Sequence, residues 1–175
     1  PFFGWNANVN DSKHLENLGR VVWGGPGAGC KGLRVDETQK KLVMPPTGPH
    51  VVCLNRNIRD ERQAPVMEQT KSEVAVLVSA TGYHYLCLLE GRAHSAMLLR
   101  KASKKWDTCA GEALLRSVGG AVTDTVGRRY NYDCDMPGVP NVCGMAASID
   151  IDLHLELTHS IIQKEIEKLE SLYPY

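Results

Sequence analysis

The hydrophobic positions of this chain fall into short continuous runs and into stretches with helical spacing. The most uniform run is residues 74–78 (VAVLV), and its length and composition predict a buried strand. Between residues 153 and 172, apolar side chains recur every three or four positions, which predicts an amphipathic helix. Strands and helices that alternate along the chain indicate an α/β architecture.

Shorter segments extend the same alternation. Turn residues bound them on both sides, and glycines and prolines mark the connecting loops. The pattern predicts weak helix at residues 59–69, a short helix at 83–90, and strands at 20–25, 32–35, 50–54, 95–99, 121–123 and 142–148.

Residues 24–32 (GGPGAGCKG) have the glycine content of a phosphate-binding P-loop. That loop requires a lysine directly after its last glycine, followed by a hydroxyl residue. Here Cys30 separates Gly29 from Lys31, and Gly32 stands in place of the hydroxyl. We therefore interpret this segment as a glycine-rich turn between two strands.

Residues 106–120 carry both the start and the stop signals of a helix. Asp107 stands where an N-cap residue would, small residues fill the first turn, and Gly119 and Gly120 end the apolar pattern. Taken alone, the pattern favours a structural role for Asp107, as a cap that contributes about 1 kcal/mol.

The same segment also carries a family signature. The run WDTCAG at residues 106–111, the apolar helix after it, the Gly-Gly pair and the Thr-Asp pair at 123–124 resemble the C-terminal signature of the inositol monophosphatase superfamily. Residues 1–3, 22–24, 80–91, 104–109 and 142–148 are similar to its 3'(2'),5'-bisphosphate nucleotidase and inositol polyphosphate 1-phosphatase branches. The resemblance implies a layered α/β/α/β/α sandwich, with residues 1–175 as its C-terminal portion.

The resemblance also implies the chemistry. It makes Asp107 a magnesium ligand and a substrate contact, in a site of two or three Mg²⁺ ions. The other ligands would come from an acidic loop and an Asp-Pro-x-Asp-Gly-Thr motif in the N-terminal half of the enzyme, and neither motif occurs in this sequence. The acidic residues that do not match the spacing of those ligands receive no metal role: Glu112, Asp124, Asp133 and Asp135.

The implied activity is that of a magnesium-dependent, lithium-sensitive phosphomonoesterase. Its substrate would be 3'-phosphoadenosine 5'-phosphate or an inositol polyphosphate such as inositol 1,4-bisphosphate. The resemblance places further substrate contacts at Asn55, Ala80, Thr81 and His84. His84 departs from both branches, which have a lysine there. Ile58 replaces a nucleotidase histidine that touches the nucleotide, whereas the short segment at residues 124–141 and the Lys-Lys-Trp run at 104–106 favour the nucleotidase, so the two branches stay nearly balanced.

Composition narrows the possible partners. The 175 residues have zero formal net charge and 43% hydrophobic content, which indicates one globular core and gives no sign of a nucleic acid polymer as partner. No apolar run approaches the roughly 20 residues needed to span a membrane. Six cysteines without a CxxC pair are consistent with reduced thiols and a cytoplasmic location. The alternative is a non-catalytic protein derived from the family, which binds a ligand or partner without turnover.

Overall fold

The computed structural model describes residues 21–25, 27–33, 47–57, 60–99, 103–133, 141 and 143–160. At its centre is a five-stranded sheet in the order β4-β3-β5-β7-β6. In chain order, its strands are β3 (Val51–Asn55), β4 (Val74–Val78), β5 (Ser95–Leu98), β6 (Ala121–Thr123) and β7 (Met145–Ser148). Strands β4 and β6 lie at its two edges. Strand β3 runs parallel to β4 and β5, whereas β7 runs antiparallel to β5 and β6. The expected α/β class is confirmed.

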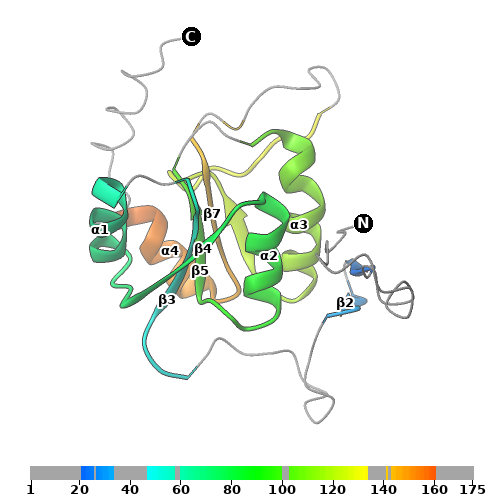
Figure 1. Cartoon of the computed structure of the whole chain (residues 1–175). Helices are drawn as coiled ribbons and strands as arrows, with labels where there is room; N and C mark the ends of the chain where they lie inside the picture. The colour runs from blue at the N-terminus through cyan, green and yellow to red at the C-terminus, as the bar shows by residue number, and fades with distance from the viewer. Residues whose placement is uncertain are drawn as a thin grey trace, which may run out of the picture.

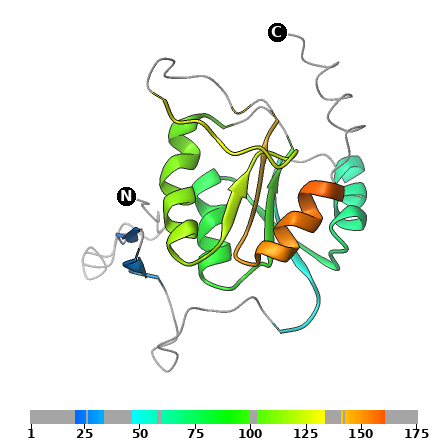
Figure 2. The same ribbon diagram turned by 180° about the vertical axis from the view of Figure 1, so that it is seen from behind.

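Helices cover both faces of this sheet, as Figures 1 and 2 show from opposite sides. One face carries α1 (Asp60–Gln69) and α4 (Ile151–Ser160), and the other carries α2 (Thr81–Leu89) and α3 (Lys105–Ser117). Strand side chains alternate between the two cores: Cys53 packs with the α2 and α3 residues, whereas Leu54 packs with Val66 of α1. The sheet is therefore the middle layer of an α/β/α sandwich.

A second, two-stranded sheet lies on the far side of α3 in both views. It pairs β1 (Trp23–Gly25) with β2 (Gly29–Lys31) in antiparallel fashion. Val22 and Cys30 pack against the same core as Leu115 of α3. A side chain at Gly24 would place its Cβ 2.3 Å from the carbonyl oxygen of Gly29, so the pairing requires glycine there. The described residues thus supply four consecutive layers, α/β/α/β, of the predicted five.

Three predictions about elements need correction. The strand after the glycine-rich turn is Gly29–Lys31, not residues 32–35. Strand β4 has its predicted bounds but lies at the edge of the five-stranded sheet, with Val74 and Leu77 partly exposed. An apolar run predicts strand length but does not distinguish a central strand from an edge strand. The C-terminal helix begins at Ile151, and its predicted part beyond residue 160 lies outside the described residues.

The described helices include none that is long and apolar enough to cross a membrane.

Candidate functional site

The carboxyl ends of the parallel strands meet at one edge of the sheet, which we call the carboxyl edge. Asn55 at the end of β3 lies opposite Val78 at the end of β4, and Leu54 lies opposite Met97 of β5. The chain leaves β3 toward α1 and leaves β5 toward α3, and these helices cover opposite faces. In open α/β sheets, ligands bind at such a switch point beyond the strand ends.

Helix α3 begins at the carboxyl edge, and its first turn contains Asp107. The sequence predicted Asp107 as the N-cap; that prediction is wrong, because Lys104 is the N-cap and Asp107 is the third helical residue. The backbone N–H of Lys104 donates to Asp107 Oδ2 at 2.8 Å, and the N–H of Asp107 donates to the carbonyl oxygen of Lys104 at 2.9 Å. The carboxylate therefore still lies at the positive end of the helix, where it accepts from the backbone N–H of the N-cap residue.

Three other predicted site residues lie at the same edge. Asn55 closes a turn at the end of β3, where its Oδ1 accepts a hydrogen bond of 2.9 Å from the backbone N–H of Asn57. Ala80 is the exposed N-cap residue of α2, and Thr81 is its first helical residue. The structure thus brings Asn55, Ala80, Thr81 and Asp107 to one side of the sheet. Their contacts with a substrate stay a prediction.

His84 is placed differently. Its side chain is buried one turn into α2, and its Nδ1 donates to the carbonyl oxygen of Ala80 at 2.9 Å. Burial lowers the pKa of His84, so the neutral imidazole is favoured at neutral pH. In the described structure His84 stabilises the N-terminal turn of α2 through its hydrogen bond to Ala80. Its predicted contact with a substrate stays a prediction.

The acidic residues differ in how far their oxygens are engaged. Among the described residues, no group of three or more His, Cys, Asp or Glu side chains is arranged to hold a metal ion. Glu112 is buried, accepts a 2.5 Å hydrogen bond from the Tyr132 hydroxyl and pairs with Arg116 at 3.2 Å. Asp107 is partly exposed at a helix N-terminus, and carboxylate oxygens suit Mg²⁺. The Asp107 carboxylate is therefore suited to bind Mg²⁺ as one ligand among several, and its metal role stays a prediction.

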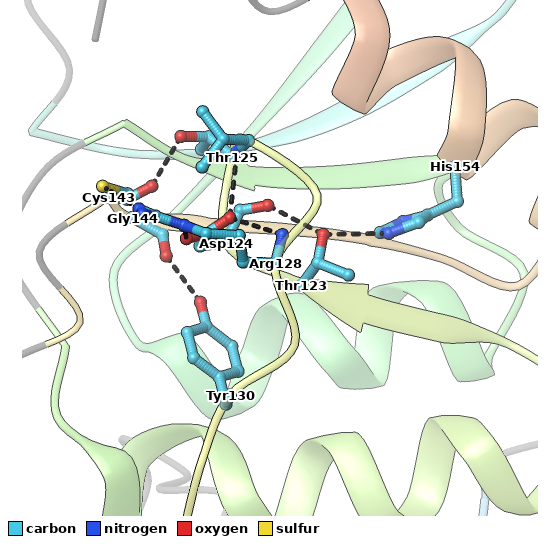
Figure 3. A network of polar contacts seen from close by, with 9 residues as sticks. Thr123, Asp124, Thr125, Arg128, Tyr130, Cys143, Gly144 and His154 are labelled. Atoms are coloured by element: carbon cyan, nitrogen blue, oxygen red, sulfur yellow. Dashed lines mark hydrogen bonds and ion pairs between the residues drawn. The ribbon is translucent and has the colours of Figure 1, made fainter. Parts of the chain in front are cut away.

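The carboxylate of Asp124 is occupied by a turn that follows β6, as Figure 3 shows. Its Oδ1 accepts hydrogen bonds from the backbone N–H groups of Val126 and Arg128, at 3.0 and 2.8 Å. Its Oδ2 accepts a 2.7 Å bond from Nε of Arg128, and this hydrogen bond is the main cause that raises the pKa of the guanidinium. Asp124 thus acts as a structural acceptor that closes the turn.

The same network joins this turn to β7 and α4 (Figure 3). The hydroxyl of Thr125 donates to the carbonyl oxygen of Cys143, and that of Tyr130 donates to the carbonyl oxygen of Gly144, each at 2.5 Å. The hydroxyl of Thr123 lies 3.0 Å from Nε2 of His154 on α4. These bonds fix the entry into β7 at the carboxyl edge.

Sequence reasoning missed a buried polar cluster beneath the start of α3. Asn141 donates from its backbone N–H to the carbonyl oxygen of Ser103 at 2.8 Å. Its side-chain Nδ2 lies 3.0 Å from Ser103 Oγ and 3.4 Å from Thr108 Oγ1. No local sequence signal points to this cluster, because Asn141 lies more than 30 residues along the chain from Ser103 and Thr108.

Together, the fold and this edge define an α/β protein in which the starts of α2 and α3, with the partly exposed carboxylate of Asp107, lie at the carboxyl ends of the strands. The sequence profile of the inositol monophosphatase family matches residues 13–167. The chain belongs to the inositol monophosphatase family.

Several curated proteins are similar in sequence. The 3'(2'),5'-bisphosphate nucleotidase 1 of Homo sapiens is 30% identical over 149 residues, which are 85% of this chain and 44% of that protein. The protein of the same name from Mus musculus is 27% identical over the same coverage. The inositol polyphosphate 1-phosphatase of Mus musculus is 37% identical over 46 residues, 26% of this chain and 12% of that protein. The chain spans less than half the length of each of these relatives.

Solved structures confirm the fold. The crystal structures of SaIMPase-II bound to inositol monophosphate and to 2'AMP each match with a TM-score of 0.61 at 14% identity. Both matches cover 88% of this chain, and they cover 57% and 56% of those chains, respectively.

Proposed function

We propose that this chain is the C-terminal part of a magnesium-dependent, lithium-sensitive phosphomonoesterase located in the cytoplasm. Its substrate is a small bisphosphorylated molecule, either 3'-phosphoadenosine 5'-phosphate or an inositol polyphosphate such as inositol 1,4-bisphosphate. The N-terminal half of the enzyme completes the site and supplies the remaining ligands of two or three Mg²⁺ ions. Membership of the inositol monophosphatase family and the similarity to bisphosphate nucleotidases support this proposal.

One structural observation carries the proposal: Asp107 lies at the switch point of the sheet, where the starts of α2 and α3 face the strand ends. The first N–H groups of a helix have no partners within the helix, and its N-terminus favours anions. A phosphate group bound at this edge would therefore meet backbone donors at Ala80 and Thr81. Asn55, at the end of β3, would offer its amide to a hydroxyl or phosphate oxygen of the substrate.

The residues of this chain have distinct roles in the proposed reaction. Asp107 would hold one Mg²⁺ through its carboxylate, which the Lys104 N–H keeps at the helix start. Mg²⁺ bound there would supply charge neutralisation on the phosphoryl oxygens and a lower pKa for a water molecule. His84 stays neutral and holds the carbonyl oxygen of Ala80, and so it orients the turn that approaches the phosphate.

A phosphate-release assay on the intact protein tests the proposal. Both candidate substrates are supplied with Mg²⁺, with Mg²⁺ removed by a chelator, and with added Li⁺. We expect release that requires Mg²⁺ and falls with Li⁺, and the preferred substrate identifies the branch. Absence of release from both substrates in the presence of Mg²⁺ would disprove the proposed activity.

A non-catalytic binding protein is the second candidate. The observation that favours it is His84, which replaces the lysine expected near a second phosphate and is buried and neutral. The two candidates differ in the N-terminal half, since an enzyme needs the acidic loop and the Asp-Pro-x-Asp-Gly-Thr motif there. Calorimetric binding of either substrate without any phosphate release would favour the binding protein.

A further inference from the structure

We propose that Asn141 is a positioning residue, which holds the Asp107 carboxylate in the orientation that Mg²⁺ binding requires. The inference rests on the proposed function, because it takes Asp107 as a metal ligand. Among the described contacts, Asn141 makes none with Asp107. Asn141 acts instead through Ser103, which precedes Asp107, and Thr108, which follows it.

We call Asn141 and its hydrogen bonds to Ser103 and Thr108 the Asn141 clamp. Its first arm, the bonds to Ser103, fixes the chain before α3. Asn141 donates its backbone N–H to the Ser103 carbonyl oxygen at 2.8 Å and its side-chain Nδ2 to Ser103 Oγ at 3.0 Å. Both residues are buried. The next residue, Lys104, donates its N–H to Asp107 Oδ2 at 2.8 Å. The position of the carboxylate therefore depends on where Ser103 holds the backbone of Lys104.

The second arm fixes the residue that follows Asp107. The second N–H of the Asn141 amide points to Thr108 Oγ1, at 3.4 Å. The Thr108 hydroxyl donates to the Lys105 carbonyl oxygen at 3.1 Å, so its oxygen is free to accept from Asn141. The Tyr132 oxygen lies 3.3 Å from Thr108 Oγ1, while its proton goes to Glu112 at 2.5 Å. Thr108 is fully buried, and its one proton is used by the Lys105 carbonyl oxygen, so toward Asn141 it can act only as an acceptor. The first turn of α3 is therefore fixed on both sides of Asp107.

The chemistry of the cluster requires an amide at position 141. Ser103 Oγ and Thr108 Oγ1 both act as acceptors, so the residue between them must present two donors. Asn supplies them from one NH₂ group, whereas Asp has the same shape but no donor when it is ionised. Groups that orient a metal ligand typically change metal affinity by about 10- to 100-fold when they are replaced.

The test compares Mg²⁺ binding by calorimetry, without substrate, in variants of the intact protein. The test variants are Asn141→Asp and Thr108→Val, and Thr108→Ser is the conservative variant that keeps the hydroxyl. Asn131→Asp is the matched control, because Asn131 is exposed and uses only its Oδ1, as an acceptor from the Asp133 N–H. Each protein is also assayed for phosphate release over a range of Mg²⁺ concentrations, and its melting temperature is measured.

We expect Asn141→Asp and Thr108→Val to weaken Mg²⁺ binding by about 10-fold or more. Excess Mg²⁺ should restore most of the maximal rate, while Thr108→Ser and Asn131→Asp should bind Mg²⁺ as the wild type does. Lower melting temperatures with unchanged Mg²⁺ affinity would show a purely structural role and overturn the inference. If Asn141→Asp does not fold, the comparison of Thr108→Val with Thr108→Ser decides in the same way.

The outcomes separate this inference from the proposed function. A wild-type protein that neither binds Mg²⁺ nor releases phosphate overturns both. If the wild type does both, and Asp107→Asn loses Mg²⁺ affinity while Asn141→Asp and Thr108→Val keep it, the proposed function stands and the positioning role of Asn141 is wrong.

Discussion

The two ends of the parallel strands contrast sharply in how their polar groups are used. At the carboxyl edge, Asp107 is partly exposed and α2 and α3 begin. The opposite edge, which we call the amino edge, holds polar groups that bind one another. There His94 Nδ1 accepts from the Val51 N–H at 2.9 Å, and Ser148 Oγ donates to the His94 carbonyl oxygen at 2.8 Å.

The amino edge also contains a second histidine with internal contacts. His50 donates from Nδ1 to the Thr70 carbonyl oxygen at 2.8 Å, and its ring meets that of His94 edge to face at 4.9 Å. Two histidine rings in contact could suggest a catalytic pair, yet the Nδ1 atom of each is hydrogen-bonded to the backbone. The comparison teaches that strand direction, which decides where helices begin, is a better guide to a candidate site than the number of polar residues.

The largest expected effect is at the carboxyl edge. Asp107→Asn keeps an acceptor for the Lys104 N–H but removes the negative charge that we propose as a Mg²⁺ ligand. Replacing a group that merely orients a ligand costs about 10- to 100-fold, so loss of the ligand should lower kcat/KM of the intact protein by more than about 100-fold. The melting temperature should change little. Full activity in this variant would remove the functional distinction between the two edges.

At the amino edge, we expect the reverse result from Ser148→Ala. The buried Ser148 hydroxyl donates to the His94 carbonyl oxygen and accepts from the Asp150 N–H at 3.1 Å. Its removal breaks these two partly buried hydrogen bonds and should lower the free energy of unfolding by about 1–3 kcal/mol. Urea unfolding measures this loss, and kcat of the folded protein should be unchanged. A large fall in kcat would contradict the view that the residues needed for catalysis lie at the carboxyl edge and not at the amino edge.

A smaller, stabilising effect is expected at the end of α1. Lys71 has a positive φ of 50°, and the N–H of Ser72 bonds to the Met67 carbonyl oxygen at 2.8 Å, as in a Schellman motif. Lys71→Gly should raise the free energy of unfolding by about 0.5–1 kcal/mol, because glycine adopts this conformation without strain. Lys71→Ala is the control: it keeps the strain and loses only an exposed ion pair of 4.0 Å with Glu156. Equal stability of the two variants would contradict this account.

The smallest expected difference concerns pH. Burial is the main cause that lowers the pKa of His50, with the neighbouring His94 adding to it. The unfolded chain therefore takes up protons near pH 6.5 before the folded chain does, and stability falls as the pH drops below that value. His50→Asn keeps a donor for the Thr70 carbonyl oxygen and should lose less stability between pH 7.5 and 5.5. Urea unfolding at both pH values measures the difference, and an equal loss in both proteins would exclude His50 as its source.

Much of the fold could be predicted from local patterns. The bounds of β4 and β6 agree with the sequence prediction, because each is a short apolar run between turn residues. The edge position of β4 could not be predicted, since pairing partners lie far away in the sequence. The start of α3 was placed too late, because Lys105 and Trp106 carry no start signal and Asp107 has the residue type of a cap.

The candidate site depended on a different kind of information. Asn55, Ala80 and Asp107 were chosen by family resemblance, and the register of β3, β4 and β5 brings them to one edge. Periodicity alone would have left them in three unrelated loops. The Asn141 clamp was missed because side-chain donors and acceptors must meet in three dimensions before the requirement for an amide becomes visible.

The exposed edge strand also bears on handling of the protein. Val74 and Leu77 are partly exposed on β4, and β4 has a neighbour on one side only in the described sheet. An open apolar edge can pair with other chains. We therefore expect residues 1–175 produced alone to aggregate, whereas the intact protein is the suitable material for each experiment above.

The packing of the β1–β2 sheet on α3 has a consequence for the order in which the segments fold during synthesis. A two-stranded sheet is at best marginally stable alone, and this one finds its packing surface on a helix that ends at Ser117. On the ribosome, β1 and β2 emerge long before that helix is complete. The β1–β2 hairpin therefore cannot pack until α3 has been synthesised. During this interval its apolar surface is exposed and is a target for chaperones that bind nascent chains.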